Sequence, residues 1–182
     1  LEGLCGSVRL MAVPSEELSG SNMPRRNQMV RDGIIRFTQG KVEFMHRGFM
    51  DGVDVAFMIH TSTCEANTGT VTKGSNGCIA KTICFKGVAA HAGGAPHKGV
   101  NALYAANVAL SAINALRETF RDSDHIRVHP IITQGGASVN AVPDRVRLES
   151  YVRGATFEGI EKANKKVNRA LIGAALSLGN NI

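Results

Sequence analysis

The sequence predicts an α+β protein: a domain with an antiparallel sheet and two helices on one face, preceded by part of an α/β domain. Two segments, 78–88 and 145–153, alternate apolar and polar side chains, which is typical of half-buried antiparallel strands. Two others, 100–120 and 156–178, repeat apolar residues every three or four positions, as helices packed on a core do. The N-terminal third instead holds short apolar runs of the kind that parallel sheets bury.

The composition ranks the possible classes of partner. Of the 182 residues, 43% are hydrophobic and 20% are charged, and no apolar run is long enough to cross a bilayer, so we expect no membrane partner. The formal net charge of +6 suits anionic partners, but only 5% of the residues are aromatic and no block of five basic residues occurs. A diffuse basic surface that favours a small carboxylate-bearing substrate fits this composition as well, and we expect no nucleic-acid partner.

The cysteines and the first residue indicate the context of the chain. Cys5, Cys64, Cys78 and Cys84 have no CxxC spacing, so we expect free thiols in a reducing cytoplasm. No signal-peptide pattern opens the chain, and Leu1 is not an initiator methionine. We therefore expect the chain to start inside a longer protein.

Residues 7–13 predict the first strand, which is short and mostly apolar and runs into Glu16 and Glu17. Neighbouring side chains point in different directions. One carboxylate can therefore hold a metal while the other acts as a base on the metal-bound water. The alternative is a solvated acidic loop, because adjacent glutamates are common.

Residues 25–37 predict a helix interrupted near Gly33, and residues 41–47 continue a helical pattern. After a turn, residues 55–59 predict a second buried strand that ends at His60. Side chains that follow strands of one sheet gather at the same edge, so we expect His60 to lie near Glu17. Glutamate oxygen and imidazole nitrogen are both normal zinc ligands, although a lone histidine is more often structural.

Residues 65–77 are rich in Gly, Ser, Thr and Asn, which predicts a linker. We place the domain boundary there, with one domain at 1–70 and the other at 71–182. The strand that follows, 78–88, places Ile79, Lys81, Ile83 and Phe85 on one face.

A loop rich in glycine comes next and contains His91 and His97. It lies between a predicted strand and a predicted helix, and loops carried by rigid elements are common places for binding and catalytic groups. The alternative is a surface loop with two titrating histidines.

The remaining segments complete the order of elements in this domain. The helix 100–120 is followed by a strand at 126–133, a glycine turn at 134–138 and the strand 145–153. Thr156 caps the last helix, which ends at Gly179. The order strand, helix, strand, strand, helix predicts an antiparallel sheet with two helices on one face. We expect the last strand of this sheet to begin at Ile182 and to be cut off by the end of the sequence.

Four separated motifs lie along the chain. They are Val13-Pro-Ser-Glu16-Glu17; Gly52 to His60; Phe85-Lys-Gly through His91 to Leu103; and Gly135-Gly136 through Asn140-Ala-Val-Pro143 to Arg153. In this order they resemble the M20 family of metallopeptidases and amidohydrolases, closest to its branch with aminobenzoyl-glutamate hydrolase and aminoacylase-like dipeptidases. The resemblance implies that 1–70 is part of a metal-binding catalytic domain and 71–182 most of a lid domain that forms homodimers.

The resemblance also implies roles for residues of the catalytic part. Glu16 matches the general base that activates a metal-bound water, and Glu17 and His60 match metal ligands. The implied cofactor is zinc, with manganese as the alternative. These roles agree with the chemistry, since a bound metal lowers the pKa of its water and polarises the carbonyl.

Three residues of the lid part match further roles in the family. His91 matches the lid histidine that polarises the scissile carbonyl, often in the partner subunit's site. Asn140 and Arg153 match residues that grip the substrate carboxylate, and an arginine fork suits a carboxylate well. Without the resemblance, Asn140 is simply a turn residue and Arg153 a surface arginine.

The implied activity is hydrolysis of an amide bond next to a carboxylate, as in an N-acyl amino acid, a dipeptide or an aminobenzoyl-glutamate. The family's earlier ligand motif and its last histidine ligand are absent from these residues, so we expect this fragment alone to be inactive. The competing hypothesis is a non-catalytic dimerisation or binding module of the same fold. Nucleic-acid binding ranks third, because Tyr104 and Tyr151 are the only tyrosines.

Overall fold

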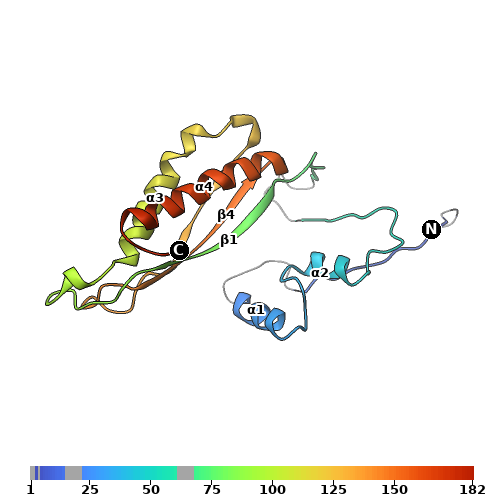
Figure 1. Cartoon of the computed structure of the whole chain (residues 1–182). Helices are drawn as coiled ribbons and strands as arrows, with labels where there is room; N and C mark the ends of the chain where they lie inside the picture. Colours follow the sequence, from blue (N-terminus) through green and yellow to red (C-terminus); the bar gives the residue numbers. More distant parts are fainter. Residues whose placement is uncertain (1–2, 4, 15–21, 61–67) are drawn as a thin grey trace. The chain divides into compact units, whose positions relative to one another are not determined.

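The computed structural model describes residues 3, 5–14, 22–60 and 68–182, which fall into two compact units, Leu1–Thr68 and Gly69–Ile182. Figure 1 shows short helices in the first unit and a sheet with long helices in the second. The described elements give an α+β fold, as the sequence predicts. None of the helices in the described part combines the length and apolarity needed to span a bilayer.

The first unit contains α1 (Met23–Arg31) and α2 (Gly40–His46). The predicted helix at 25–37 is confirmed only as far as Arg31, because Gly33 has a φ of +69° and turns the chain, and residues 34–37 are not helical. The turn beginning at Asp51 is also confirmed, with Gly52 at a φ of +72°.

Glu43 of α2 fixes the loop that joins the two helices. Its carboxylate accepts the backbone N–H groups of Arg36 and Phe37, both at 2.9 Å, and the Nε–H of Arg47 at 2.7 Å. These donors, with the Phe37 N–H contributing most and the Arg47 side chain next, lower the pKa of Glu43 to about 2. The buried carboxylate is therefore ionised and fully hydrogen-bonded.

The predicted buried strands at 7–13 and 55–59 are wrong. Both segments lack regular structure, and Val8 and Ile59 are 98% and 96% exposed. An apolar run forms a buried parallel strand only when other strands pair with it on both sides. Within the described residues, no strand pairs with either segment.

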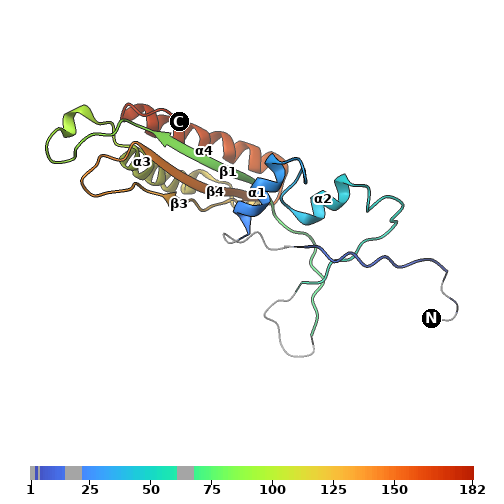
Figure 2. The same ribbon diagram turned by 90° about the horizontal axis from the view of Figure 1, so that it is seen from below.

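The second unit has the predicted order of elements. They are β1 (Gly77–Lys86), the 3₁₀ turn η1 (Pro96–Lys98), α3 (Ala102–Ala115), the 3₁₀ turns η2 (Arg117–Thr119) and η3 (Asp122–Asp124), β2 (Arg127–Val128), β3 (Ile131–Gln134), β4 (Arg145–Gly154) and α4 (Phe157–Ser177). The sheet order is β1-β4-β2, and β3 also pairs with β4. The views in Figures 1 and 2 place α3 and α4 on the same face of this sheet.

The ladder between β1 and β4 is antiparallel and runs from Gly77 opposite Gly154 to Lys86 opposite Arg145. The alternation predicted for both strands is confirmed, because every second residue of β4 from Val146 onward is buried. The helix-facing side of β1 is more buried than its other side along the strand. Apart from Lys81, the charged residues of the two strands lie on the opposite face of the sheet.

The predicted strand at 126–133 is divided into β2 and β3. The division falls at His129 and Pro130, and proline has no N–H to donate to a ladder. β2 places Arg127 opposite Arg153, and β3 places Ile131 opposite Glu149. Both short strands therefore occupy the same edge of β4.

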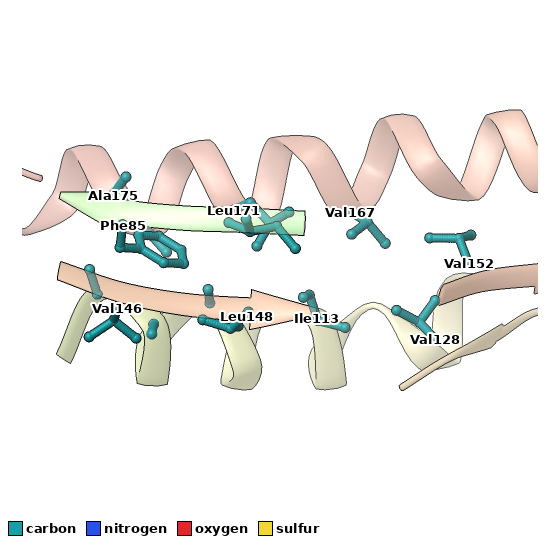
Figure 3. Close-up of a cluster of buried hydrophobic side chains, with 14 of the residues drawn as sticks. Phe85, Ile113, Val128, Val146, Leu148, Val152, Val167, Leu171 and Ala175 are labelled. Carbon is teal, nitrogen blue, oxygen red and sulfur yellow. The ribbon is translucent and has the colours of Figure 1, made fainter. Parts of the chain in front are cut away.

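The core lies between the sheet and the two helices, and Figure 3 shows part of it, with Phe85, Ile113 and Leu148 among the labelled side chains. The part of the predicted α3 stripe formed by Leu103 and Leu110 is only partly buried. The fully buried positions of α3 are mostly small: Ala102, Ala105, Ala106, Ala109 and, as the one large residue, Ile113. α3 packs on both the sheet and α4, and small side chains allow these close approaches.

The predicted cap and apolar face of α4 are confirmed. The Gly159 N–H donates to Thr156 Oγ1 at 3.1 Å, and the stripe from Ile160 to Ala174 is buried. Half-buried Lys81 of β1 joins this helix, because its Nζ donates to Asn164 Oδ1 at 2.7 Å and Asn168 Oδ1 at 2.6 Å. Burial lowers the pKa of Lys81.

The end of the described chain returns to β1. The Lys86 N–H donates to Asn181 O at 2.8 Å, and the Asn181 N–H donates to Lys86 O at 2.9 Å. Asn181 therefore pairs with the last residue of β1 as an antiparallel bridge.

We predict that acid loosens the α1–α2 loop through Glu43. The pKa of Glu43 is lowered from 4.5 to about 2, so its stabilising effect is complete above pH 4.5 and is lost as the pH falls through about 2. Amide exchange at Arg36 and Phe37, corrected for intrinsic rates, should therefore accelerate over that range. Glu43→Gln should remove the pH dependence. Equal corrected rates at both ends of the range in the unaltered chain would contradict the assignment.

Candidate functional site

The six residues predicted for a site are divided between the two units. Glu16 and Glu17 lie outside the described residues, so their roles remain predictions. His60 is exposed at the end of the segment 55–60 in the first unit. His91, Asn140 and Arg153 all belong to the second unit.

The structure brings His91 and Asn140 together. His91 forms an antiparallel bridge with Ala141, and the Ala92 N–H donates to Asn140 O at 2.8 Å. The Val142 N–H donates to Ala90 O at 2.9 Å, which holds the same two loops one step further along. The Asn140 turn and the His91 loop, about 50 residues apart in sequence, thus continue the direction of the β1–β4 ladder.

Two residues that the sequence interpretation left without a role hold the His91 loop in place. A Cβ on Gly87 would lie 1.9 Å from the carbonyl oxygen of Val100, so only glycine fits where the loop returns to the strand. Asn101 caps α3, because its Oδ1 accepts the N–H groups of Leu103 at 2.9 Å and Tyr104 at 3.1 Å. The sequence could have indicated this role, because an Asn that follows a glycine-rich loop and precedes an apolar helix is a typical N-cap.

The His91 ring is oriented by its own loop. Its Nδ1 accepts the backbone N–H of Gly94 at 2.8 Å and that of Gly93 at 3.2 Å. A nitrogen that accepts hydrogen bonds carries no proton, so the neutral ring carries its proton on Nε2. Within the described residues no group binds this Nε2. The exposed imidazole therefore presents an N–H donor to a ligand.

Arg153 lies far from that pair of loops. It is eight residues along β4 from Arg145, the strand's first residue, which is about 26 Å at the rise of an extended strand. Its guanidinium lies 5.1 Å from the centre of the Tyr151 ring, and that ring contacts His129 edge-on with centres 5.9 Å apart. Arg153 is thus held at the opposite end of the sheet from His91 and Asn140.

The open face of the sheet is strongly positive. The residues of β4 that face away from the helices include three arginines and one acid, Glu149. By the strand register, the cations of this face are Lys86, Arg127, Arg145, Arg147 and Arg153. Five cations against one carboxylate favour an anionic ligand over this surface.

The described residues do not assemble a metal site. No group of three possible His, Cys, Asp or Glu ligands comes together in the described ranges. Of the two predicted ligands only His60 is described, and a tetrahedral zinc site needs four ligands. A groove of about 530 Å³ in the first unit, lined in part by Ile34, Glu43 and Arg47, contains none of the predicted site residues.

The second unit matches a known family of domains. A protein-family model described as a peptidase dimerisation domain matches residues 72–176, which is more than half of the chain.

The chain is also similar to curated proteins. It is 31% identical over 140 residues to the Xaa-Arg dipeptidase of Mus musculus, covering 77% of this chain and 31% of that protein. It is 33% identical over 148 residues to the indole-3-acetyl-aspartic acid hydrolase of Enterobacter agglomerans, covering 80% and 33%. It is 30% identical over 180 residues to one of the polypeptides of the p-aminobenzoyl-glutamate hydrolase of Escherichia coli K12, covering 97% and 36%. The chain thus spans about a third of the length of these relatives.

Solved structures support the fold. An aminobenzoyl-glutamate utilization protein from Klebsiella pneumoniae superposes with a TM-score of 0.52 and 28% identity, covering 57% of this chain and 26% of that one. An amidase of the hydantoinase/carbamoylase family from Burkholderia multivorans gives a TM-score of 0.51 at 20% identity, covering 59% and 26%. The second similarity concerns the fold alone.

We predict that the Gly94 N–H sets the proton position on His91. Gly94→Pro removes this donor, so nitrogen-15 NMR of the neutral ring should change from a pure Nε2–H form to a mixture of both tautomers. Gly94→Ala is the matched control. It keeps the N–H, its Cβ would lie 3.4 Å from Nδ1, and its φ is not in the left-handed range. An unchanged spectrum in Gly94→Pro would refute the role of this hydrogen bond.

Proposed function

This chain belongs to the M20 peptidase family through its dimerisation domain, and we propose that it is part of a metal-dependent amidohydrolase that cleaves an amide bond next to a carboxylate. The observation that supports this most directly is the pairing of the His91 loop with the Asn140 turn at one end of the domain. Both are candidate substrate contacts, and they are joined by backbone hydrogen bonds that do not depend on a ligand.

The charge of the open sheet face supports a narrower class of substrate. Two of the relatives are named for substrates that join an acyl group to glutamate or aspartate, and a third is named for dipeptides ending in arginine. Five cations and one carboxylate on the open face suit an acidic amino acid and disfavour a basic one. We therefore propose an N-acyl aspartate or N-acyl glutamate as the substrate.

Each lid residue has a chemical task in this proposal. The Arg153 guanidinium binds the substrate carboxylate through two parallel N–H donors. The His91 Nε2–H donates to the carbonyl oxygen and stabilises the negative charge that develops on it. The Asn140 side chain is exposed beside His91 and orients the same end of the substrate.

The metal completes the chemistry of this proposal. Zinc, or alternatively manganese, would be bound by Glu17 and His60 with Glu16 as the base. The described residues do not form a ligand set, so we derive no reaction step through the metal. The remaining ligands would come from parts of the protein outside this chain.

A homodimer explains the separation of the two sets of lid residues. About 26 Å along β4 is longer than an N-acyl amino acid, so one substrate does not reach both Arg153 and His91 of the same chain. We propose that each site combines Arg153 of one protomer with His91 and Asn140 of the other. The outer edge of β3 is exposed along all four residues, and such an edge can pair with a second copy.

The competing function is a non-catalytic dimerisation module. The family match covers the dimerisation domain, and the described residues contain no metal-ligand set. Hydrolysis of an N-acyl glutamate by the complete protein would decide against it.

We also propose a reducing, cytoplasmic location. Cys78 and Cys84 are free and lie on the same extended strand, six residues or about 20 Å apart. That distance is far too great for a disulfide between them.

We predict that Arg153→Gln in the complete protein raises KM for an N-acyl glutamate by about ten- to a hundredfold. The reason is that a hydrogen bond to a charged group contributes roughly 1.5–3 kcal/mol. Arg25→Gln removes one positive charge from the exposed side of α1 and is the matched control. Equal losses in both variants would mean that only the overall charge matters. Full retention in Arg153→Gln would remove Arg153 from the site.

Shared sites also predict complementation between two inactive variants. His91→Ala and Arg153→Ala should each be nearly inactive alone. A mixture re-equilibrated at equal amounts should regain about a quarter of the activity, because half of the dimers are mixed and each has one intact site. No recovery, with mixed dimers verified by mass spectrometry, would place both residues in the same protomer's site.

A further inference from the structure

A second charged surface lies on the helix side of the sheet, in a groove of about 460 Å³ between the segment 119–126 and the N-terminal part of α4. One wall carries Thr119, Phe120 and Arg121. The other wall is α4 itself. Five cations line the groove: Arg121, Lys162, Lys165, Lys166 and Arg169. None of them belongs to the proposed catalytic residues.

The spacing of the cations along α4 does not stabilise the helix. Lys162 and Lys166 are four residues apart, as are Lys165 and Arg169, and like charges at this spacing repel on a helix surface. Glu161 lies four residues before Lys165, yet the two form no ion pair, and Lys165 lines the groove instead. For Lys165 and Arg169, which pair with no carboxylate of the described residues, this repulsion is not compensated within the helix, so both are available to a ligand.

The groove contains too few carboxylates to neutralise its cations. Glu158 accepts from Lys162 Nζ at 2.5 Å and also interacts with Arg121, and these two cations lower the pKa of Glu158. Asp124 is the second carboxylate of the lining. Five cations against two carboxylates leave an excess of three positive charges.

Lys166 is held in place by neutral groups, whereas Lys165 and Arg169 are unengaged among the described residues. Lys166 Nζ donates to the backbone oxygen of Thr119 at 2.8 Å and to Thr119 Oγ1 at 3.1 Å, above the half-buried Phe120 ring. These acceptors are neutral, so the charge of Lys166 remains. In the part of the chain that the structure describes, Lys165 and Arg169 have no hydrogen-bond or ion-pair partner.

We propose that this groove binds a compact anion that carries several phosphate groups. Arg121 lies on one wall and the other four cations lie on α4, so one small anion can contact several of them together. Lysine ammonium groups and arginine forks both suit phosphate oxygens. The groove is large enough to admit a short polyphosphate. A nucleic-acid strand fits less well, because Phe120 is the one aromatic among the described residues of the lining and Lys166 Nζ already lies over its ring.

The test uses the whole chain with sodium tripolyphosphate as the probe, at constant ionic strength. We expect saturable binding of one tripolyphosphate per chain by calorimetry and a rise in Tm, because a ligand that binds only the folded form stabilises it. Inorganic phosphate should bind at least about tenfold more weakly, since it reaches fewer of the cations. Equal binding of both anions, or no saturable binding of tripolyphosphate, would overturn the proposal.

Matched double variants locate the site. Lys165→Gln with Arg169→Gln should weaken tripolyphosphate binding by about tenfold or more. Both side chains are exposed, so this variant should fold, and without the anion its Tm should equal or exceed that of the unaltered chain. Lys73→Gln with Lys98→Gln removes the same charge from exposed positions outside the groove and should leave binding unchanged. An equal loss in both double variants would show attraction to net charge alone and would also overturn the proposal.

Discussion

The antiparallel ladder between β1 and β4 is the interaction on which the rest of the second unit depends. It joins ten residue pairs in one register, and each strand alternates its side chains between two faces. A shift of one residue would turn Phe85 and Val146 toward water and bring Arg145 into the core. The same ladder continues past the strand ends into the bridge between His91 and Ala141. The core, the positive open face and the paired site loops therefore follow from a single register.

The parts of the fold that the sequence predicts well are those with a local, periodic signal. The alternation of β4, the apolar stripe of α4 and the Thr156 cap all depend on residues within a few positions of each other. The buried strands predicted at 7–13 and 55–59 fail because an apolar run has no period of its own and becomes a strand only when partners pair with it. The alanine face of α3 was missed because burial there depends on how closely α4 and the sheet approach.

For the candidate site too, local motifs could be identified from the sequence, whereas contacts between distant segments could not. The motifs identified His91 and Asn140 separately, but only the backbone pairing of their loops puts them side by side. Arg153 belongs to the same motif as Asn140, and the extended strand carries it to the other end of the sheet. The tautomer of His91 depends on two backbone N–H groups whose direction no sequence pattern encodes. Glu16 and Glu17 keep the roles that the family resemblance gives them, as predictions.

Pro130 has a consequence for how the sheet meets other chains. It interrupts the outer strand at a position without an N–H, which leaves the four residues of β3 as a short pairing edge. Short, interrupted edges resist the open-ended stacking of strands that leads to aggregation. They also bury little area, whereas a stable association buries about 800 Å² on each partner. A second copy that docks on β3 must therefore gain most of its contact area from other surfaces of the domain.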